Sequence, residues 1–582
     1  MVRAAVKTGG GRGLWRRGVL HAFVIAALLA RSMALEAAAT TTAGAAALAP
    51  IIAQSLADPV PPVIDGARLD VQVLRALYDG RGSAPLWVTE SDADARIDAV
   101  LGVLRAADRD GLDPRAYRIA QIEARRSATD PLARAELDLL LSEAVMRYGV
   151  HVRTGARRPR VVIPEVQPVV VDPDPLPIAL DIATSSPADV APYMQTLAPQ
   201  HAEYITLREL LVTYRERAAR GGWPTVPDGP KLTPGSVDRS VRGLRERLAA
   251  TGELSDRAQV APAQRDVYDK TLEAAVEVFQ KRHGLVPDGT VGPRTRAMLN
   301  VTAAERVEQI VANLERLRWL PAELGERYVW INIPDYSLRV EDGGTTTLEM
   351  PVIVGKLSWQ TPMFSSEIQH LVFNPPWNVP PRIAAEELVP RGMADEGYFA
   401  AQGISWRGGT RVASAGSRVS DGSSVVTPRR LRQAPGPKNP LGRVKFNMPN
   451  PFGVYLHDTP NKDKFRLGVR SLSHGCVRVA NAPALAAALL GDMPEWSEER
   501  RKGALSTWST RAVNLRSPIP VHLVYATAWR AHDGGVEFRE DIYKSDAQLA
   551  KELSKPRSIR PAAPVAVLAV DATTAPLASA SP

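Results

Sequence analysis

The most reactive side chain that the sequence offers is a single thiol. Cys476 is the only cysteine among 582 residues, and it lies in the stretch SLSHGCVRV. A free cysteine is a weak nucleophile, because its pKa of roughly 8.5 leaves only a few per cent as thiolate at neutral pH. It therefore needs a base or a positive field nearby before it can attack a carbonyl carbon.

Two of the nine histidines compete for the role of that base. His474 is two residues before Cys476, where contact across a tight turn is awkward. His457 lies 19 residues upstream in VYLHDTP, at the end of an alternating strand and before a turn at residues 459–460. Strand ends and glycine-containing loops often carry catalytic groups, so His457 is the predicted base.

The loop around the thiol could bind the charges that such an attack creates. Ser473 precedes Gly475, which lets the backbone turn closely. The N–H groups of Gly475 and Cys476 could converge on an oxyanion, and losing one such donor typically costs ~10²–10³ in rate. Arg478, on the same strand face as Cys476, suits a substrate carboxylate, although a surface ion pair is an alternative.

The segments LHDTP and SHGCVRV together match the signature of the L,D-transpeptidases at every defining position. The stretches at 373–380 and 431–450 resemble the larger Gram-negative branch of that family. The resemblance implies a cysteine enzyme that attacks the carbonyl between meso-diaminopimelate and D-alanine in a tetrapeptide stem. The side-chain amine of a second stem then opens the thioester, giving a 3→3 cross-link in peptidoglycan.

The resemblance also implies roles for residues of this chain. Cys476 is the expected nucleophile and His457 the general base and later acid. The third member of the triad is a backbone carbonyl, assigned to Asp458, and backbone N–H groups at Gly475 belong to the oxyanion hole. The expected substrate contacts are Tyr455, Ser473, His474 and Arg478, and Ser473 is also expected to shape the loop. No metal or cofactor is expected, and the family's susceptibility to carbapenems implies a covalent adduct on Cys476.

A second resemblance lies upstream of the catalytic motifs. The stretch YDKTLEAAVEVFQKRHGLVPDGTVGPRTRAMLN (268–300) is similar to the peptidoglycan-binding domains that accompany many wall enzymes. Together with an apolar stripe at 237–248 before it, this stretch predicts a small unit of three helices, with Pro293 beginning the third. The resemblance implies affinity for peptidoglycan, and a mere helical spacer is the alternative.

The N-terminus has the pattern of an export signal. Residues 1–39 combine a positively charged start with an apolar stretch at 18–30 and small residues at 37–39, and an uncleaved anchor is the alternative. We therefore expect a periplasmic protein. One cysteine excludes an intramolecular disulfide, a CxxC redox site and a cysteine-rich zinc site.

The order of patterns predicts a multidomain α+β chain. It has a helical scaffold domain, a three-helix peptidoglycan-binding domain and a mostly-β L,D-transpeptidase domain with a capping insertion. The expected boundaries are a signal or anchor at 1–39, a linker at 40–56, the scaffold at 57–228, the binding domain at 229–302, a connecting helix at 303–326, the catalytic domain at 327–545 with its insertion at 382–430, and a disordered tail at 546–582.

The charge balance favours an anionic partner. The net charge is +9, and no dense Lys/Arg run is interleaved with aromatic residues, so nucleic acid is not expected. A basic stretch near the thiol suits the carboxylates of peptidoglycan stems but could equally be a solvated loop face. It consists of Lys462, Lys464, Arg466 and Arg470.

Three other functions compete with cross-linking. A zinc peptidase needs ligand spacings such as H-E-x-x-H, which do not occur. A non-catalytic wall-binding protein would not require the H…SHGC constellation. An L,D-carboxypeptidase, or an enzyme exchanging D-amino acids, would use the same site with water or a free D-amino acid as acceptor, and the sequence leaves that alternative open.

Overall fold

The computed structural model describes residues 46–57, 62–88, 93–157, 159, 166–167, 173–255, 261–407, 430–531 and 533–555. The predicted signal or anchor, residues 408–429 of the predicted insertion and residues 556–582 of the predicted tail lie outside them. Within the described ranges, no helix has the length and apolar character needed to cross a membrane.

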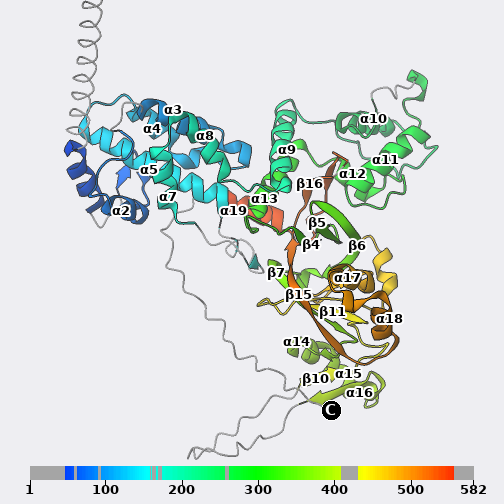
Figure 1. Ribbon diagram of the computed structural model, residues 1–582. Helices are drawn as coiled ribbons and strands as arrows, with labels where there is room; N and C mark the ends of the chain where they lie inside the picture. Colours follow the sequence, from blue (N-terminus) through cyan, green and yellow to red (C-terminus); the bar gives the residue numbers. More distant parts are fainter. Residues whose placement is uncertain are drawn as a thin grey trace, which may run out of the picture.

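The N-terminal region is a group of helices around one central helix (Figure 1). α5 (Pro131–Thr154) begins after Asp130, whose side chain accepts a hydrogen bond from the N–H of Ala133. Almost every residue of α5 from its second turn onward is buried. A helix that is covered on all sides needs neighbours on all sides. α5 contacts α2 (Val71–Asp79), α4 (Ile119–Arg125) and α7 (Pro175–Thr184). The same apolar core contains side chains of α3 (Ala93–Arg105), α8 (Pro187–Thr196) and α9 (Ala202–Ala219), and β1 (Val63–Ile64) pairs with β2 (Ala67–Arg68) in a hairpin.

The predicted flexible linker at 40–56 is wrong over its described part, because residues 46–57 are helical. Leu48, Ile52 and Leu56 recur every four residues, and all three are buried in the core of the helical region. This apolar stripe gives the segment a face to bury, which a run of alanine and threonine alone would not.

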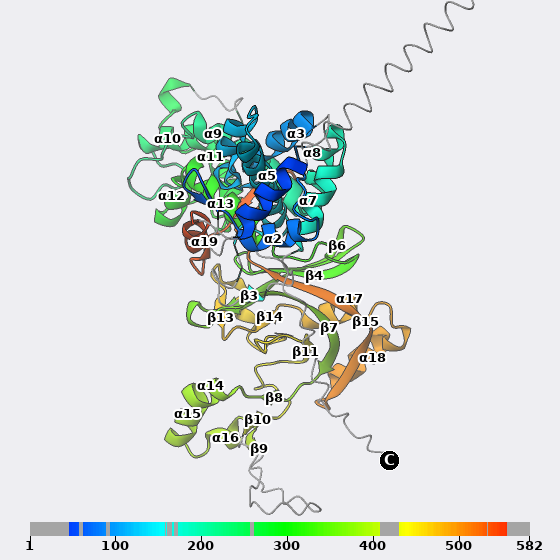
Figure 2. The same ribbon diagram turned by 90° about the vertical axis from the view of Figure 1, so that its left-hand side faces the viewer.

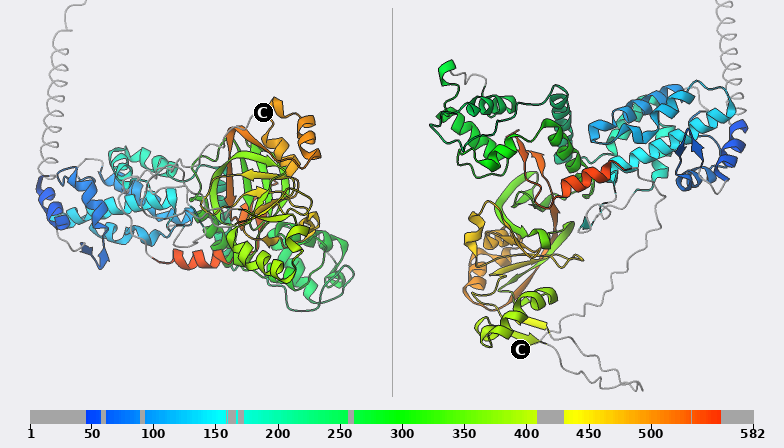
Figure 3. Two further views of the ribbon diagram at one scale, coloured as in Figure 1. Left: turned by 90° about the horizontal axis from the view of Figure 1, so that it is seen from below. Right: turned by 180° about the vertical axis from the view of Figure 1, so that it is seen from behind.

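The predicted three-helix unit is present as a separate small core. α10 (Ser240–Thr251), α11 (Lys270–Arg282) and α12 (Pro293–Leu299) surround buried side chains that include Val276 and Phe279. Pro293 is the first residue of α12, as predicted. This unit lies apart from the N-terminal helices in the views of Figures 1 and 3.

A connecting helix joins the helical regions to the sheet. α13 (Ala303–Leu317) begins with a capping box, in which Thr302 and Glu305 satisfy each other's backbone N–H groups. It packs against α9 and also contacts α19 (Ser545–Leu553). The predicted disordered tail is therefore wrong over residues 546–553, because α19 buries Leu549 in the core of the sheet domain.

The catalytic region is a sheet that closes on itself. Its strand order is β11-β12-β14-β6-β5-β4-β15-β7-β3, and β11 also pairs with β7, while β13 pairs with β6. The sheet encloses one apolar core, and α17 (Ala482–Leu489) and α18 (Glu498–Ser506) pack side chains against it. The strands are β3 (Val166–Gln167), β4 (Arg327–Asn332), β5 (Ser337–Asp342), β6 (Thr345–Gly355), β7 (Met363–Phe373), β11 (Val444–Asn447), β12 (Leu456–His457), β13 (Ser471–Ser473), β14 (Val477–Val479) and β15 (Arg511–Val524).

The capping insertion forms a small lobe at the end of the sheet domain (Figure 2). The lobe consists of a three-stranded sheet, of order β8-β10-β9, and several short helices. Sheet and helices share one apolar core, which includes Ile383 and Leu431. Its elements are β8 (Trp377–Asn378), α14 (Pro381–Ile383), a π-helical turn (Ala384–Leu388), α15 (Val389–Ala394), α16 (Tyr398–Ala401), β9 (Ile404–Arg407) and β10 (Arg430–Gln433). After β15, a hairpin of β16 (Ala528–Arg530) and β17 (Val536–Phe538) leads to α19.

Candidate active site

Two short parallel strands bring the thiol and the predicted base together. In the pairing of β12 with β14, His457 lies opposite Arg478. The N–H of Val477 donates to the carbonyl of Tyr455 over 3.2 Å. This register places Cys476, directly before β14, beside Tyr455, directly before β12.

His457 is held in one orientation by its own neighbour. Its Nδ1–H donates to the backbone carbonyl of Asp458 over 2.6 Å, which leaves Nε2 without the proton and available as a base. The imidazole is buried, and burial followed by the charge of Arg478 lowers the pKa of His457 to about 3. The ring is therefore neutral at physiological pH, as a general base must be.

The side chain of Asp458 has a separate, structural task. One carboxylate oxygen accepts the N–H of Arg443 over 2.8 Å, and the other binds the ammonium group of Lys462 over 2.5 Å. These bonds fix the turn after β12 and, with it, the carbonyl that orients His457. The prediction that the backbone rather than the carboxylate of Asp458 faces the imidazole agrees with this geometry.

The thiol of Cys476 is subject to opposing influences. Burial raises its pKa, whereas hydrogen bonds with Tyr455 and the charges of Lys445 and Arg478 lower it, and the net pKa lies above the ordinary value. Since the thiol holds its proton and His457 stays neutral, the resting pair is uncharged. For the sulfur to act as a nucleophile, its proton would have to move to the imidazole.

Lys445 is a member of this site that the sequence reading missed. It lies opposite His457 in the pairing of β11 with β12, and its Nζ is 4.0 Å from the ring centroid of Tyr455. The alternation of buried Val444 and Phe446 could have placed Lys445 on the other strand face. The sequence could not predict that β11 pairs with β12, because this pairing depends on a contact between two separate strands.

The loop before the thiol is closed by one hydroxyl. Ser473 donates to the carbonyl of Cys476 over 2.6 Å and accepts the N–H of Gly475 over 3.1 Å. These bonds agree with the expectation that Ser473 shapes the loop, whereas its buried hydroxyl is used within the loop and does not suit the predicted substrate contact. The predicted oxyanion donor at Gly475 is also engaged, while Cys476 N–H has no acceptor among the residues that the structure describes. Gly475 has φ of +103°, a conformation that favours glycine.

Arg478 is placed as a cation without a fixed counter-charge. Across the described ranges it forms no ion pair, and its buried Nε has no hydrogen-bond acceptor. Such a guanidinium, next to the thiol, is suited to a substrate carboxylate. This arrangement agrees with the role predicted for it.

The basic stretch that follows β12 is mostly committed to the fold. Lys462 binds Asp458, and Arg470 donates to the carbonyls of Val352 and Tyr336. Lys464 pairs with an adjacent aspartate, and Arg466 is exposed. Lys462 and Arg470 are therefore bonded within the fold, and the alternative of a solvated loop face describes Lys464 and Arg466.

His474 faces the capping insertion rather than the predicted base. Its Nε2 lies 2.5 Å from a carboxylate oxygen of Glu387, in the π-helical turn. Its ring packs edge-on against Trp359, with centroids 4.9 Å apart, and Arg382 of the insertion stacks 3.8 Å above that indole ring. His474 thus links the loop that carries Cys476 to the insertion.

Comparisons with known proteins agree with this arrangement. Residues 326–495 match a family model described as an L,D-transpeptidase catalytic domain. Residues 72–211 match one described as a scaffold domain, and residues 238–299 one described as "Putative peptidoglycan binding domain". Together with the closed sheet and the paired His457 and Cys476, these matches define an L,D-transpeptidase catalytic domain.

The chain therefore carries an L,D-transpeptidase catalytic domain and a peptidoglycan-binding domain in one polypeptide, which confirms both resemblances and the multidomain α+β prediction. A protein of Haemophilus influenzae named "Putative L,D-transpeptidase" is 37% identical over 249 residues, 42% of this chain. The match spans about half the length of that relative, 49%.

Solved structures with a similar domain are more distant. An L,D-transpeptidase of Xylanimonas cellulosilytica is 17% identical, covering 51% of this chain and 99% of its own, with a TM-score of 0.17. An L,D-transpeptidase of Mycobacterium smegmatis is 16% identical, covering 34% of this chain and 58% of its own, with a TM-score of 0.15.

Proposed function

We propose that this protein forms 3→3 cross-links in peptidoglycan through a thioester on Cys476. An L,D-transpeptidase catalytic domain supports a peptidoglycan cross-linking function in general. The observation that carries the more specific proposal is the neutral His457, oriented through Nδ1 by the Asp458 carbonyl, on the strand that pairs with the strand after Cys476.

In the first half of the reaction, the sulfur of Cys476 attacks the carbonyl that joins the third stem residue to D-alanine. The thiol proton passes to Nε2 of His457. When the carbon–nitrogen bond breaks, His457 returns that proton to the departing amine, and free D-alanine leaves a thioester behind. No oxidant, reductant or energy source is needed, because one acyl bond replaces another.

In the second half, the side-chain amine of a second stem attacks the thioester carbonyl. His457 accepts the amine proton and returns it to the departing sulfur. Water as acceptor would instead give an L,D-carboxypeptidase, and a free D-amino acid would give exchange. These remain the alternatives to cross-linking, since the acceptor is not fixed by Cys476 or His457.

The charges around the thiol support an anionic peptide substrate. Lys445 and Arg478 both lie close enough to Cys476 to affect its ionisation, and neither forms an ion pair within the described residues. Peptide stems carry several carboxylates, which these two cations could bind. The peptidoglycan-binding domain supports the same polymer as partner.

The predicted N-terminal signal leads us to propose the periplasm as the location, and the alternative of an uncleaved segment at 1–39 would anchor the protein in the inner membrane. We further propose that carbapenems acylate Cys476. The intact mass of the protein after carbapenem treatment would then rise by one drug molecule, and a Cys476→Ala variant would show no increase.

Product analysis tests the proposed function. The purified protein is incubated with disaccharide-tetrapeptides, and the products are separated and identified by mass. We expect free D-alanine and a dimer whose cross-link joins two third-position residues, both absent with Cys476→Ala. Tripeptide without dimer would identify a carboxypeptidase, and D-alanine release by Cys476→Ala would overturn the nucleophile assignment.

A further inference from the structure

A buried threonine on a different strand connection holds the peptide bond before the thiol. Thr361 lies just before β7, and its Oγ1 donates to the carbonyl of Gly475 over 2.8 Å. The same Oγ1 accepts the N–H of Gly355, at the end of β6, over 2.9 Å. An amide can only donate and a carbonyl can only accept, so the direction of both bonds is fixed.

The chain approaches itself very closely at this point. A Cβ atom on Gly355 would lie 2.0 Å from the carbonyl oxygen of Trp359, so only glycine fits there. This contact keeps the segment at 356–361 folded over the end of β6. Thr361 is thereby held against the catalytic loop, although the two are far apart in the sequence.

The orientation of one peptide plane links Thr361 to the chemistry. In a trans peptide, the carbonyl of Gly475 and the N–H of Cys476 belong to the same plane and point in opposite directions. Holding the carbonyl therefore also sets the direction of the N–H. Among the described residues, Cys476 N–H has no acceptor, whereas Gly475 N–H is bonded to Ser473.

We propose that Thr361 is a positioning residue that aims the N–H of Cys476 at the oxyanion formed during acyl transfer, and that Tyr543 holds Thr361 in place. The inference rests on the proposed role of Cys476 as nucleophile. Under this proposal, the peptide between Gly475 and Cys476 stabilises the negative charge that develops on the substrate oxygen as the sulfur attacks.

Tyr543 supports Thr361 from the C-terminal end of the domain. Its hydroxyl donates to the carbonyl of Gly355 over 2.6 Å and accepts the N–H of Thr361 over 3.2 Å. Tyr543 lies beyond residues 326–495, the part of the chain that matches the catalytic family model. The support for the catalytic loop thus comes in part from the segment that leads into α19.

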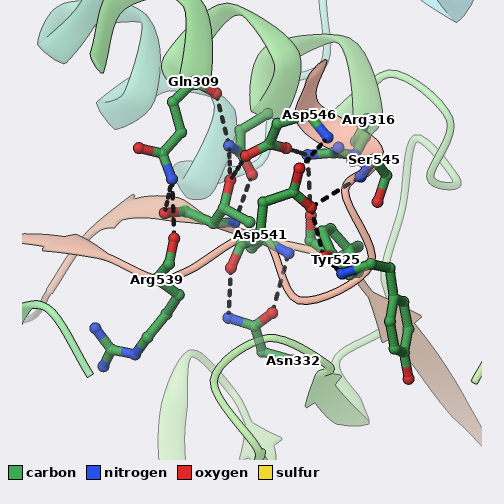
Figure 4. Close-up of polar contacts among 12 residues, drawn as sticks. Gln309, Arg316, Asn332, Tyr525, Arg539, Asp541, Ser545 and Asp546 are labelled. Atoms are coloured by element: carbon green, nitrogen blue, oxygen red, sulfur yellow. Dashed lines mark hydrogen bonds and ion pairs between the residues drawn. The ribbon is translucent and has the colours of Figure 1, made fainter. Parts of the chain in front are cut away.

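That segment is itself anchored by the network in Figure 4. The N–H of Tyr543 donates to the hydroxyl of Tyr525, which in turn donates to a carboxylate oxygen of Asp541 over 2.7 Å. Asp541 also accepts the N–H groups of Ser545 and Asp546 at the start of α19. A continuous series of hydrogen bonds therefore runs from the helix junction to the peptide plane before Cys476.

The loss of activity expected for Thr361→Val follows from this geometry. Thr361→Val keeps the shape of the side chain but removes the hydroxyl, so Gly355 N–H and Gly475 C=O lose their shared partner. Deleting an oxyanion donor costs ~10²–10³ in rate, and here the donor remains but its direction is released. We expect a loss of about 10- to 100-fold in kcat with little change in KM.

The test compares two reactions of the same thiol in the full-length protein. Acylation by p-nitrophenyl acetate forms a tetrahedral oxyanion, whereas alkylation by iodoacetamide forms a carbon–sulfur bond with loss of iodide and no oxyanion. For Thr361→Val, we expect acylation to slow about 10- to 100-fold and alkylation to stay within about twofold of the wild type. Thr361→Ser should restore acylation, and Tyr543→Phe should slow it in part.

Thr154→Val is the matched control, because it removes another buried threonine hydroxyl, in α5, far from the thiol in sequence. It should leave both reactions unchanged. If acylation and alkylation fall together in Thr361→Val, or if neither falls, the proposal is overturned. Should Thr361→Val not fold, as judged by thermal unfolding, Tyr543→Phe provides the same comparison with Thr361 in place.

The two proposals fail in distinguishable ways. Neither p-nitrophenyl acetate nor iodoacetamide depends on recognition of peptidoglycan. A wild-type protein that reacts with both reagents at Cys476 but releases no D-alanine from any stem would overturn the proposed function alone. Equal acylation of the wild type and Thr361→Val, with normal D-alanine release, would overturn only the positioning role.

Discussion

Replacing Asp458 with asparagine separates the two roles that one residue could have. In serine-protease triads, where a carboxylate orients the histidine, changing that carboxylate to an amide lowers kcat by about 10⁴. Here the imidazole donates to the backbone carbonyl of Asp458, and the carboxylate points to Arg443 and Lys462. Because Asp458→Asn keeps the backbone carbonyl, we expect kcat to fall by no more than about tenfold.

The same substitution should lower stability. The bond from the N–H of Arg443 becomes one to a neutral acceptor, and hydrogen bonds to charged groups contribute about 1.5–3 kcal/mol. The ion pair with Lys462 adds little to this free energy, because the lysine side chain is 46% exposed and solvent screens the pair. The free energy of unfolding should therefore fall by about 1–3 kcal/mol.

The assay measures D-alanine release from disaccharide-tetrapeptides together with thermal unfolding. Asp463→Asn is the matched control, because Asp463 is an exposed acidic residue in the same stretch, paired with Lys464. It should change neither kcat nor stability. A folded Asp458→Asn protein whose kcat is about 10³-fold or more below the wild type would refute the assignment of the backbone carbonyl.

Three further predictions concern charge and stability. Lys445→Met should slow iodoacetamide alkylation of Cys476 roughly threefold or more at neutral pH, since Lys445 lowers the pKa of the thiol; an unchanged rate would contradict this. Burial holds the pKa of His457 at about 3, below the ordinary 6.5 of an unfolded chain, so stability is lost as pH falls from about 6.5. The melting temperature of His457→Gln should then fall less than that of the wild type between about pH 7 and pH 5, and an equal fall would argue against a buried neutral ring. Arg316→Met removes the partner of buried Asp546, 2.5 Å away, and should cost about 3–5 kcal/mol of unfolding free energy; an unchanged melting temperature would rule out a structural role for this pair.

The sequence was informative where chemistry is local. The stretch around Cys476 and the strand that ends at His457 predicted that a thiol and an imidazole share one site, and the pairing of β12 with β14 brings these two segments together. The apolar spacing in 237–279 likewise predicted the helices of the small binding domain. In each case, residues close together in the sequence carry the pattern.

The parts that sequence reasoning missed depend on contacts between distant segments. Lys445 joins the site through the pairing of β11 with β12. Thr361 contacts the catalytic loop from the connection between β6 and β7, and Tyr543 supports Thr361 from a later part of the chain. The assignments for Ser473 and Gly475 changed for a similar reason. Which hydroxyl or amide is already bonded depends on the folded loop, and residue type alone does not determine it.

The resting charges of the site also bear on mechanism. A thiol with a raised pKa beside an imidazole with a lowered pKa does not form a stable thiolate–imidazolium pair. Under the proposed mechanism, proton transfer is coupled to attack on the substrate, and the cations Lys445 and Arg478 would stabilise negative charge only as it develops. A neutral resting thiol would also limit reaction with adventitious electrophiles.

The most direct test of the central claim is the intact mass of the protein during turnover. The protein is mixed with a disaccharide-tetrapeptide, quenched in acid within the first turnovers, and analysed whole and after proteolysis. The account predicts an adduct with the mass of the donor less one D-alanine residue, located on the peptide that contains Cys476 and absent from Cys476→Ala. Rapid release of D-alanine without any such adduct, or an adduct on another residue, would contradict it.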